Sequence, residues 1–215
     1  MPDGGIITHY PSNVIPKHSS DTQPVDLPVS NALGQRSAQA YTEVLECADV
    51  HLNDRYRARE INGKYTTFCN FFVWDITRAM GCEIPHQYDL STGEPVSNED
   101  WDYPNNPNHK WMTANDMVDW LRNFGAKNGW NKITPEKAIE LANQGFPVTA
   151  VWRQPRPGYS GHVAMVAPEQ NSGDGLKIYQ AGGTNYEYVD ILTGFRADGY
   201  GNPILLEDIE FYWHI

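Results

Sequence analysis

Three residues that lie far apart in the sequence have the side chains that nucleophilic catalysis by a cysteine requires: Cys69, His162 and Gln180. A cysteine nucleophile needs a base within hydrogen-bond distance and a third group that orients the base. Histidine can take up and return a proton near neutral pH, and an amide oxygen can accept a hydrogen bond from its ring. The fold must bring these three side chains together.

Cys69 is predicted to lie on the first turn of one helix within residues 65–81. Four apolar residues follow it at helical spacing, namely Phe72, Val73, Ile76 and Met80. Thr66 or Thr67 is the expected N-cap, and Gly81 is the expected end. The positive end of the helix dipole would favour thiolate, the nucleophilic form of cysteine. The alternative is that Cys69 is one more buried core residue.

His162 begins an otherwise apolar strand directly after Gly161. Residues 162–167 and 176–181 are predicted to form a hairpin closed by a turn at residues 171–175. If Val166 faces a residue near Leu176, His162 faces one near Gln180, and side chains alternate along a strand. Gln180 is therefore the predicted orienting group for the imidazole.

Alternatives to this assignment remain open. Asn185 is the second candidate for the orienting group. A register error of one residue would instead place Tyr179 or Ala181 opposite His162. Gln180 would then be an exposed amide at a strand end, and His162 a structural histidine.

The order of elements predicts an α+β domain in which N-terminal helices pack on an antiparallel sheet. Helices are expected at residues 37–52, 65–81, 113–124 and 134–143, and strands at residues 146–152, 162–167, 176–181, 186–192 and 209–215. Residues 36–215 would form this single domain, preceded by an extended arm or linker at residues 1–35. Residues 53–64 are expected to be a loop. The excursion at residues 82–112 is also expected to be a loop, with aromatic side chains that line a groove or pin the loop to the core.

Composition excludes several classes of function. The chain has 215 residues, a net charge of −11 and a pI near 4.9, which argues against nucleic-acid binding and against attraction to anionic membranes. No run is apolar enough to span a bilayer, and the N-terminus lacks the basic and apolar regions of a signal peptide. A protein that acts outside the cytoplasm would then need another route of delivery.

The remaining residues with reactive side chains favour structural roles. The histidines and cysteines have no metal-ligand spacing, so neither a metal nor a cofactor is expected. Cys47 and Cys82 are expected to be packing residues or a disulfide. Asp75 and Arg78 are expected to pair on the surface of the cysteine helix.

Two motifs resemble the papain-like peptidoglycan hydrolases of the NlpC/P60 and CHAP superfamily. Cys69–Val73 resembles the cysteine helix of that superfamily, and Gly161–Val166 resembles its histidine strand. Gln180 falls where those families place a polar third residue. The resemblance covers about residues 60–190. The excursion at residues 82–112 departs from a compact CHAP domain.

The resemblance implies hydrolysis of a wall-peptide amide through a thioester, by an endopeptidase or an N-acetylmuramoyl-L-alanine amidase. Cys69 would attack the carbonyl, and its backbone N–H would donate to the oxyanion. His162 would take the thiol proton and later protonate the leaving amine. Tyr65, Trp152 and Ser160 are candidate substrate-binding residues.

A monomer is expected. With no signal peptide, a cell-wall hydrolase would have to reach the wall by phage lysis or through a secretion system. An immunity or delivery protein is then a further class of partner. Two other functions stay open at this point. The same thiol chemistry would suit a toxin that acts as a protein deamidase or protease, and the aromatic-rich excursion would suit a non-catalytic module that binds glycan or peptide.

Overall fold

The computed structural model describes residues 25–215, apart from residues 62, 98, 103, 104, 169, 171, 172, 174, 199 and 200. Its α-helices are α1 (Ala38–Ala48), α2 (Cys69–Ala79), α3 (Ala114–Trp120), α4 (Pro135–Asn143) and α5 (Ile191–Gly194). Its strands are β1 (Arg59–Ile61), β2 (Lys64–Thr66), β3 (Gln87–Asp89), β4 (His109–Trp111), β5 (Trp130–Ile133), β6 (Val148–Trp152), β7 (His162–Val166), β8 (Lys177–Gln180), β9 (Tyr186–Asp190) and β10 (Glu210–His214).

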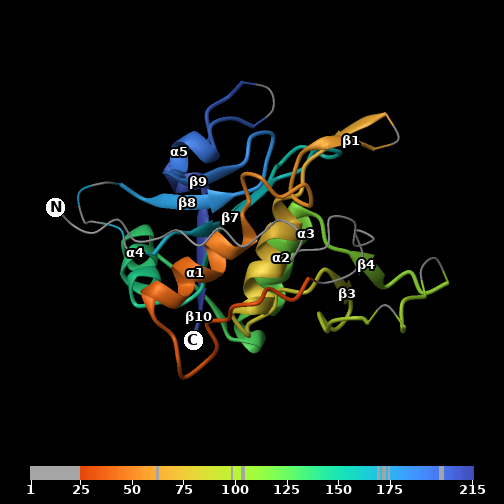
Figure 1. Ribbon diagram of the computed structural model, residues 1–215. Coiled ribbons are helices and arrows are strands. Elements are labelled where there is room, and N and C mark those ends of the chain that lie inside the picture. The colour runs from red at the N-terminus through yellow and green to blue at the C-terminus, as the bar shows by residue number, and fades with distance from the viewer. Residues whose placement is uncertain are drawn as a thin grey trace.

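A six-stranded antiparallel sheet in the order β5-β10-β6-β7-β8-β9 forms the centre of the molecule. Figure 1 shows α1 and α2 in front of this sheet, with α5 beside the β8–β9 end. β6 and β7 are almost wholly buried because helices α2, α3 and α4 all contact them. The predicted α+β class is confirmed, and helices precede most of the sheet in the chain.

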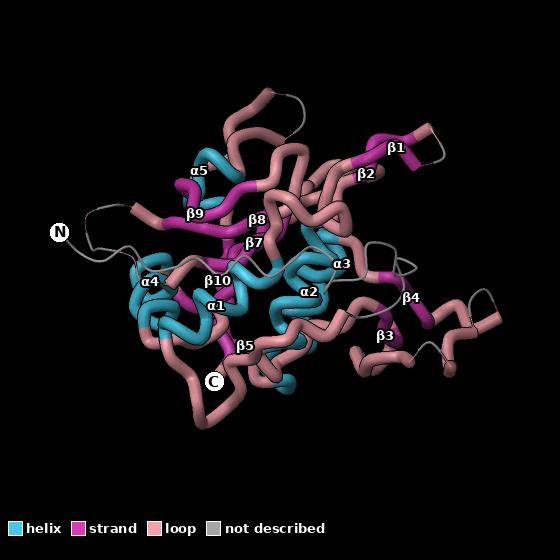
Figure 2. The backbone as a smooth tube through the Cα atoms, in the orientation of Figure 1, coloured by secondary structure: helices cyan, strands magenta, loops and turns pink. Residues whose placement is uncertain are grey.

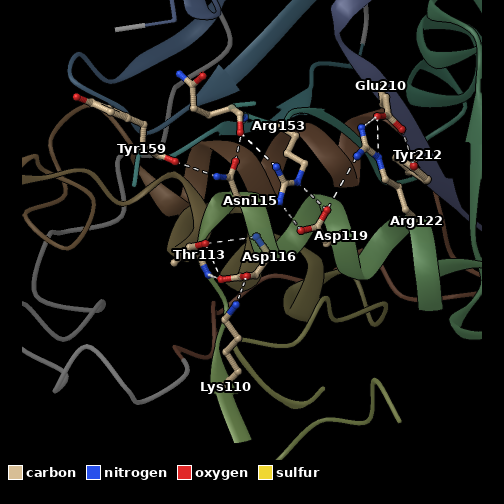
Figure 3. A network of polar contacts seen from close by, with 11 residues as sticks. Lys110, Thr113, Asn115, Asp116, Asp119, Arg122, Arg153, Tyr159, Glu210 and Tyr212 are labelled. Carbon is tan, nitrogen blue, oxygen red and sulfur yellow. Dashed lines mark hydrogen bonds and ion pairs between the residues drawn. The ribbon is translucent and has the colours of Figure 1, made fainter. Parts of the chain in front are cut away.

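Local sequence explains three of the helix starts. Ser37 caps α1 through Ala40, and Thr134 caps α4, whose first residue is Pro135. α3 begins with a capping box between Thr113 and Asp116, as Figure 3 shows. These starts agree with the expected boundaries to within a residue or two. α1 ends at Ala48, earlier than expected, because Asp49 adopts a left-handed conformation.

The cysteine helix α2 differs from expectation at its start. Its N-cap is Phe68, which makes no side-chain cap, so the predicted threonine cap is wrong. Thr66 is unavailable because it ends β2 and its hydroxyl donates to the carbonyl of Lys64. The end is as predicted, with Gly81 in a left-handed conformation at φ 68° just past the helix.

Several segments expected to be loops contain strands. Residues 53–64 include β1, which pairs with β2 in a hairpin, and the excursion includes the β3–β4 pair, visible in Figure 2. β5 lies in a stretch for which no strand was expected. The sheet is also more than a meander, because β10, the last strand, inserts between β5 and β6.

The N-terminal arm lies partly within the described residues. Val25 is buried, and Leu27 and Val29 pack against the core. Asn31 is also buried, and its side chain donates to the carbonyl of Gly145 at 2.7 Å. Residues 25–35 are thus part of the folded body, while the expectation for residues 1–24 lies outside the described residues.

The prediction that Asp75 and Arg78 pair on the surface is wrong. Asp75 is fully buried and accepts both a bidentate contact from Arg55, at 2.6 and 3.0 Å, and the hydroxyl of Tyr56 at 2.8 Å. Arg78 instead pairs with carboxylates outside the helix. A residue on the inner face of α2 has no surface partner, and helical spacing alone did not identify that face.

Candidate active site

Cys69 is the first residue of α2, which packs against β7, the strand that begins with His162. The thiol is almost fully buried, with 3% of the residue exposed. Backbone N–H groups of Val163, Asn70 and Cys69 itself lie close enough to the sulfur to favour the thiolate. Because Val163 directly follows His162 in β7, the sulfur lies beside the start of the histidine strand.

The ionisation of Cys69 differs from the expectation. Burial raises the pKa of the thiol to about 11, although the backbone N–H groups at the helix start act in the opposite direction. Removal of the sulfur from water penalises the thiolate more than these dipoles stabilise it. The candidate nucleophile is therefore a neutral thiol at rest, and the predicted shift toward thiolate is wrong for the free protein.

His162 and Gln180 form a direct hydrogen bond, with 2.5 Å between Nε2 of the imidazole and Oε1 of the amide. The amide orientation is set by its other end, because Nε2 of Gln180 donates to the carbonyl of Thr184 at 3.1 Å. Oε1 must then accept, so Nε2 of His162 carries the ring hydrogen. Nδ1 is left with its lone pair, which is the state that a general base requires.

The hairpin pairing that brings these side chains together is shifted by two residues from the expected one. Val166 pairs with Ile178, not with a residue at Leu176. In this register, Gln180 of β8 lies diagonally across from His162 of β7 and not directly opposite it. A shift of two keeps every side chain on the same face of the sheet, and diagonal neighbours are within reach of long side chains. The predicted contact therefore survives the error in register. Residues 171, 172 and 174 of the predicted turn lie outside the described residues.

The imidazole is held neutral by its surroundings. Burial lowers the pKa of His162 to about 4, although the hydrogen bond to Gln180 acts to raise it. The ring of Phe195 packs edge-on against the imidazole, with 4.7 Å between the ring centroids. The resting pair is thus a neutral thiol and a neutral imidazole. Within the described residues, no hydrogen bond joins Cys69 to His162.

A cleft of about 360 Å³ opens at the histidine end of β7. Its lining includes His162 and Gln180 together with two of the three predicted substrate-binding residues, Trp152 and Ser160. The third, Tyr65, is 67% exposed and lies at the rim, where its hydroxyl donates to the carbonyl of Gly183 at 3.3 Å. Cys69 is not among the lining residues, so its buried sulfur does not face this cleft.

Glycines let backbone and side chains approach closely around the cleft. A Cβ atom on Gly194 would lie 2.7 Å from Oε1 of Gln180, and one on Gly161 would lie 2.2 Å from the carbonyl oxygen of Trp152. Both distances are shorter than any normal contact. The orienting amide and the start of β7 therefore depend on glycine at these two positions.

Asn185, the second candidate for the orienting group, holds the loop instead. Its Oδ1 accepts from the backbone N–H of Gly182 at 3.0 Å, and its Nδ2 donates to the carbonyls of Val50 and Tyr56 at 2.7 and 3.2 Å. Asn185 thus ties the loop that carries Thr184 to the segment after α1.

Asn115 of α3 holds the other wall of the cleft and was not identified from the sequence. Its Nδ2 donates to the carbonyl of Tyr159 at 2.9 Å, and its Oδ1 accepts from the backbone N–H of Gln154 at 3.0 Å, as Figure 3 shows for the labelled pair. These two hydrogen bonds span both ends of the loop between β6 and β7. Phe195 was missed as well, because nothing in its local pattern indicates contact with a distant histidine.

The other sulfur atoms lie outside the site. Cys47 and Cys82 are buried free thiols, so the disulfide considered from the sequence is absent. The described residues contain no group of three or more histidine, cysteine, aspartate or glutamate side chains placed to hold a metal ion. None of the helices in the described part of the chain has the length and apolar character needed to cross a bilayer.

No protein-family model matches the sequence, and a search of curated proteins finds none with significant similarity to it. Function is therefore inferred from the geometry of the site and from the resemblance of the two short motifs.

Proposed function

We propose that the protein is a cysteine-dependent hydrolase that cleaves an amide bond of cell-wall peptides. The observation that carries this proposal is the hydrogen-bonded series from Thr184 through Gln180 to His162, which lines a cleft at the start of β7, the strand against which the helix of Cys69 packs. A histidine oriented in this way, with Nδ1 unprotonated and a thiol packed behind its strand, has the parts that nucleophilic catalysis requires.

Because both resting groups are neutral, proton transfer accompanies attack. As Sγ of Cys69 bonds to the substrate carbonyl carbon, its proton moves to Nδ1 of His162. The backbone N–H of Cys69 donates to the developing oxyanion. The carbon–nitrogen bond then breaks, the imidazolium protonates the leaving amine, and a thioester remains. Water attacks the thioester with Nδ1 as base, which releases a carboxylic acid and restores the thiol.

This chemistry requires the sulfur to reach Nδ1 when substrate is bound. Catalytic hydrogen bonds are often long in a free enzyme and shorten in the substrate complex. The proposal therefore needs the Cys69 side chain, at the first turn of α2, to move toward the imidazole when substrate binds. Gln180 keeps the other ring hydrogen on Nε2, so Nδ1 is free to accept a proton at the start of each half of the reaction.

The choice of substrate rests on the motif resemblance to the NlpC/P60 and CHAP superfamily. A helix that begins with the nucleophile and packs on an antiparallel strand that begins with the base agrees with a papain-like arrangement. We propose wall peptide as substrate, delivery by lysis or a secretion apparatus, and a neutralising immunity protein where the producer shares the target wall.

The test is release of soluble muropeptides from purified peptidoglycan, measured by mass spectrometry. Cys69→Ala should abolish release, while Cys47→Ala should release fragments at the wild-type rate because Cys47 is a buried thiol outside the site. Circular dichroism of both variants checks the fold. An unchanged rate in Cys69→Ala would eliminate the mechanism, and activity on proteins but not on walls would assign a deamidase or protease.

A second candidate function is a non-catalytic binding module, which the burial of the thiol favours. Rapid alkylation at neutral pH does not separate the two candidates, because a thiol whose pKa is about 11 reacts slowly in either case. Trapping does separate them. A catalytic Cys69 should form a thioester that hydroxylamine releases after a brief incubation with substrate, whereas a binding module should form none.

A further inference from the structure

Arg196 differs from the other arginines of the chain. Eight of the nine arginines make a polar, charged or ring contact: Arg36, Arg55, Arg57, Arg59, Arg78, Arg122, Arg153 and Arg156. Arg196 makes no hydrogen bond or ion pair with any residue that the structure describes. It is also exposed and lines the cleft that holds His162.

The position of Arg196 relates it to the reacting groups. It directly follows Phe195, whose ring packs on the imidazole of His162, and it lies two residues after Gly194, which abuts Gln180. Consecutive Cα atoms are about 3.8 Å apart, and an extended peptide advances about 3.3–3.6 Å per residue. A group bound by Arg196 would thus lie within a few residues of the bond being cleaved.

The other charged side chain of the cleft lining is already engaged. The carboxylate of Asp198 accepts from the backbone N–H of Asn202 at 3.1 Å and from its Nδ2 at 2.8 Å. Asp198 therefore caps its own turn, and its carbonyl accepts from Gln154 at 2.8 Å. Among the described residues of the lining, Arg196 is the cation whose donors point to no protein partner.

We infer that Arg196 binds a free carboxylate of the substrate and selects for peptides that carry one near the scissile amide. A guanidinium presents paired donors that match a carboxylate. The protein as a whole carries a net charge of −11, so an anionic peptide is repelled except where a local cation receives it. This inference deepens the proposed function and rests on it for the position of the scissile bond.

The test uses three muropeptides of one length. The first is a disaccharide tetrapeptide with D-glutamate, the second has the α-carboxyl of that residue amidated, and the third has its C-terminal carboxyl amidated. The wild-type protein should show kcat/KM lower by about 10- to 100-fold on one amidated form, as expected for a charge-assisted hydrogen bond. The preference should shrink as salt rises from about 0.1 M to about 1 M, because exposed charges are then screened.

Arg196→Gln should reduce kcat/KM on the preferred carboxylate form to the level of the amidated form, mainly through KM. Arg196→Lys should keep part of the preference. The matched control is Arg57→Gln, which removes the same charge from an exposed ion pair away from the cleft. Equal activity of the wild type on all three muropeptides would overturn the inference, as would equal losses in Arg196→Gln on every form.

Binding separates this inference from the proposed function. Cys69→Ala, which cannot turn over substrate, is titrated calorimetrically with the three muropeptides, alone and combined with Arg196→Gln. Selective binding that requires Arg196, without hydrolysis by the wild type, would reject the hydrolase and keep the carboxylate site. Binding that does not depend on Arg196, or no binding and no hydrolysis, would overturn the site.

Discussion

At the scale of single residues, the site is a neutral pair held in one tautomer. Burial lowers the pKa of His162 to about 4 and raises that of Cys69 to about 11, so both groups stay uncharged between these values. The hydrogen bond to Gln180 orients the imidazole of His162 and fixes the ring hydrogen on Nε2. In the proposed mechanism, catalysis therefore depends on how the Gln180 amide orients the imidazole more than on a preformed thiolate.

Replacement of Gln180 tests this dependence. In Gln180→Glu, a carboxylate beside Nε2 stabilises the imidazolium, so the pKa of His162 should rise by about 1–3 units. Because the proposed mechanism uses neutral imidazole as the base, the acid limb of kcat/KM should move upward in pH by the same amount. Gln180→Ala should leave the acid limb of kcat/KM at low pH. It should reduce the plateau value of kcat/KM by up to about 100-fold, since the imidazole loses its orienting group. Titration of the imidazole by NMR checks the shift independently, and an unmoved resonance in Gln180→Glu would contradict the assignment.

The contact between His162 and Gln180 was predictable from the sequence for a physical reason. Side chains alternate between the two faces of a sheet, so a register error of an even number of residues does not change the face on which a side chain lies. The two-residue error therefore left Gln180 on the same face as His162. The ionisation of Cys69 was not predictable in this way. A helix start is a local feature, whereas burial is a property of everything that packs around it.

At the scale of elements, α2 is fixed by a buried ion pair in its middle and by its contact with β7. Asp75→Asn keeps the shape of the side chain but leaves the Arg55 guanidinium buried without its counter-charge. Loss of one partner from a buried pair is expected to lower the free energy of unfolding by about 3–5 kcal/mol. The control is Asp54→Asn, in an exposed pair, where about 0–1 kcal/mol is expected. Urea denaturation of both variants measures the difference, and similar midpoints would contradict the structural role.

The contact of α5 with β8 has a different consequence, because it bears on the orienting amide. Gly194→Ala would place a methyl group 2.6 Å from Cδ1 of Ile178 and 2.7 Å from Oε1 of Gln180, so the amide must move. We expect kcat to fall by about 10- to 100-fold, since displacement of about 1 Å in a catalytic group has effects of this size. The control is Gly173→Ala, where a Cβ atom meets open space. Equal kcat values in the two variants would show that Gly194 has no part in positioning.

Elements with strong local signals were predicted, and those made by tertiary pairing were not. α3 and α4 have caps that satisfy their first N–H groups, so their starts are readable. The short strands β1, β3, β4 and β5 have three or four residues each, too few for alternation to stand out. The place of β10 between β5 and β6 depends on contacts between segments distant in the sequence, which local sequence patterns do not predict.

At the scale of the whole molecule, buried histidines couple the fold to pH. His86 is packed between Trp74 and Phe71, with ring centroids 4.6 and 4.4 Å away, and its Nε2 is buried without a hydrogen-bond partner among the described residues. Burial, reinforced by the charge of Arg55, lowers the pKa of His86 to about 3. Protonation in the unfolded chain begins near the ordinary value of about 6.5.

The folded state therefore binds fewer protons than the unfolded state as the pH falls from about 6.5 toward about 3, and stability is lost over that interval. Above it, the contribution is fully present. One pKa unit corresponds to about 1.4 kcal/mol, so His86 alone should remove on the order of 4 kcal/mol by the lower end. His162 acts in the same direction down to its own pKa of about 4.

His86→Phe should weaken this acid dependence. The phenyl ring fits among the same aromatic neighbours and carries no buried nitrogen, so stability near neutral pH should be equal or higher. The difference between variant and wild type should grow as the pH falls, which urea denaturation at a series of pH values measures. His51→Gln, at an exposed position, should follow the wild type at every pH. Parallel plots of unfolding free energy against pH for His86→Phe and the wild type would contradict this. They would mean that the imidazole of His86 binds protons equally in the folded and unfolded states, and acid sensitivity would then have to arise at His162 or at the carboxylates.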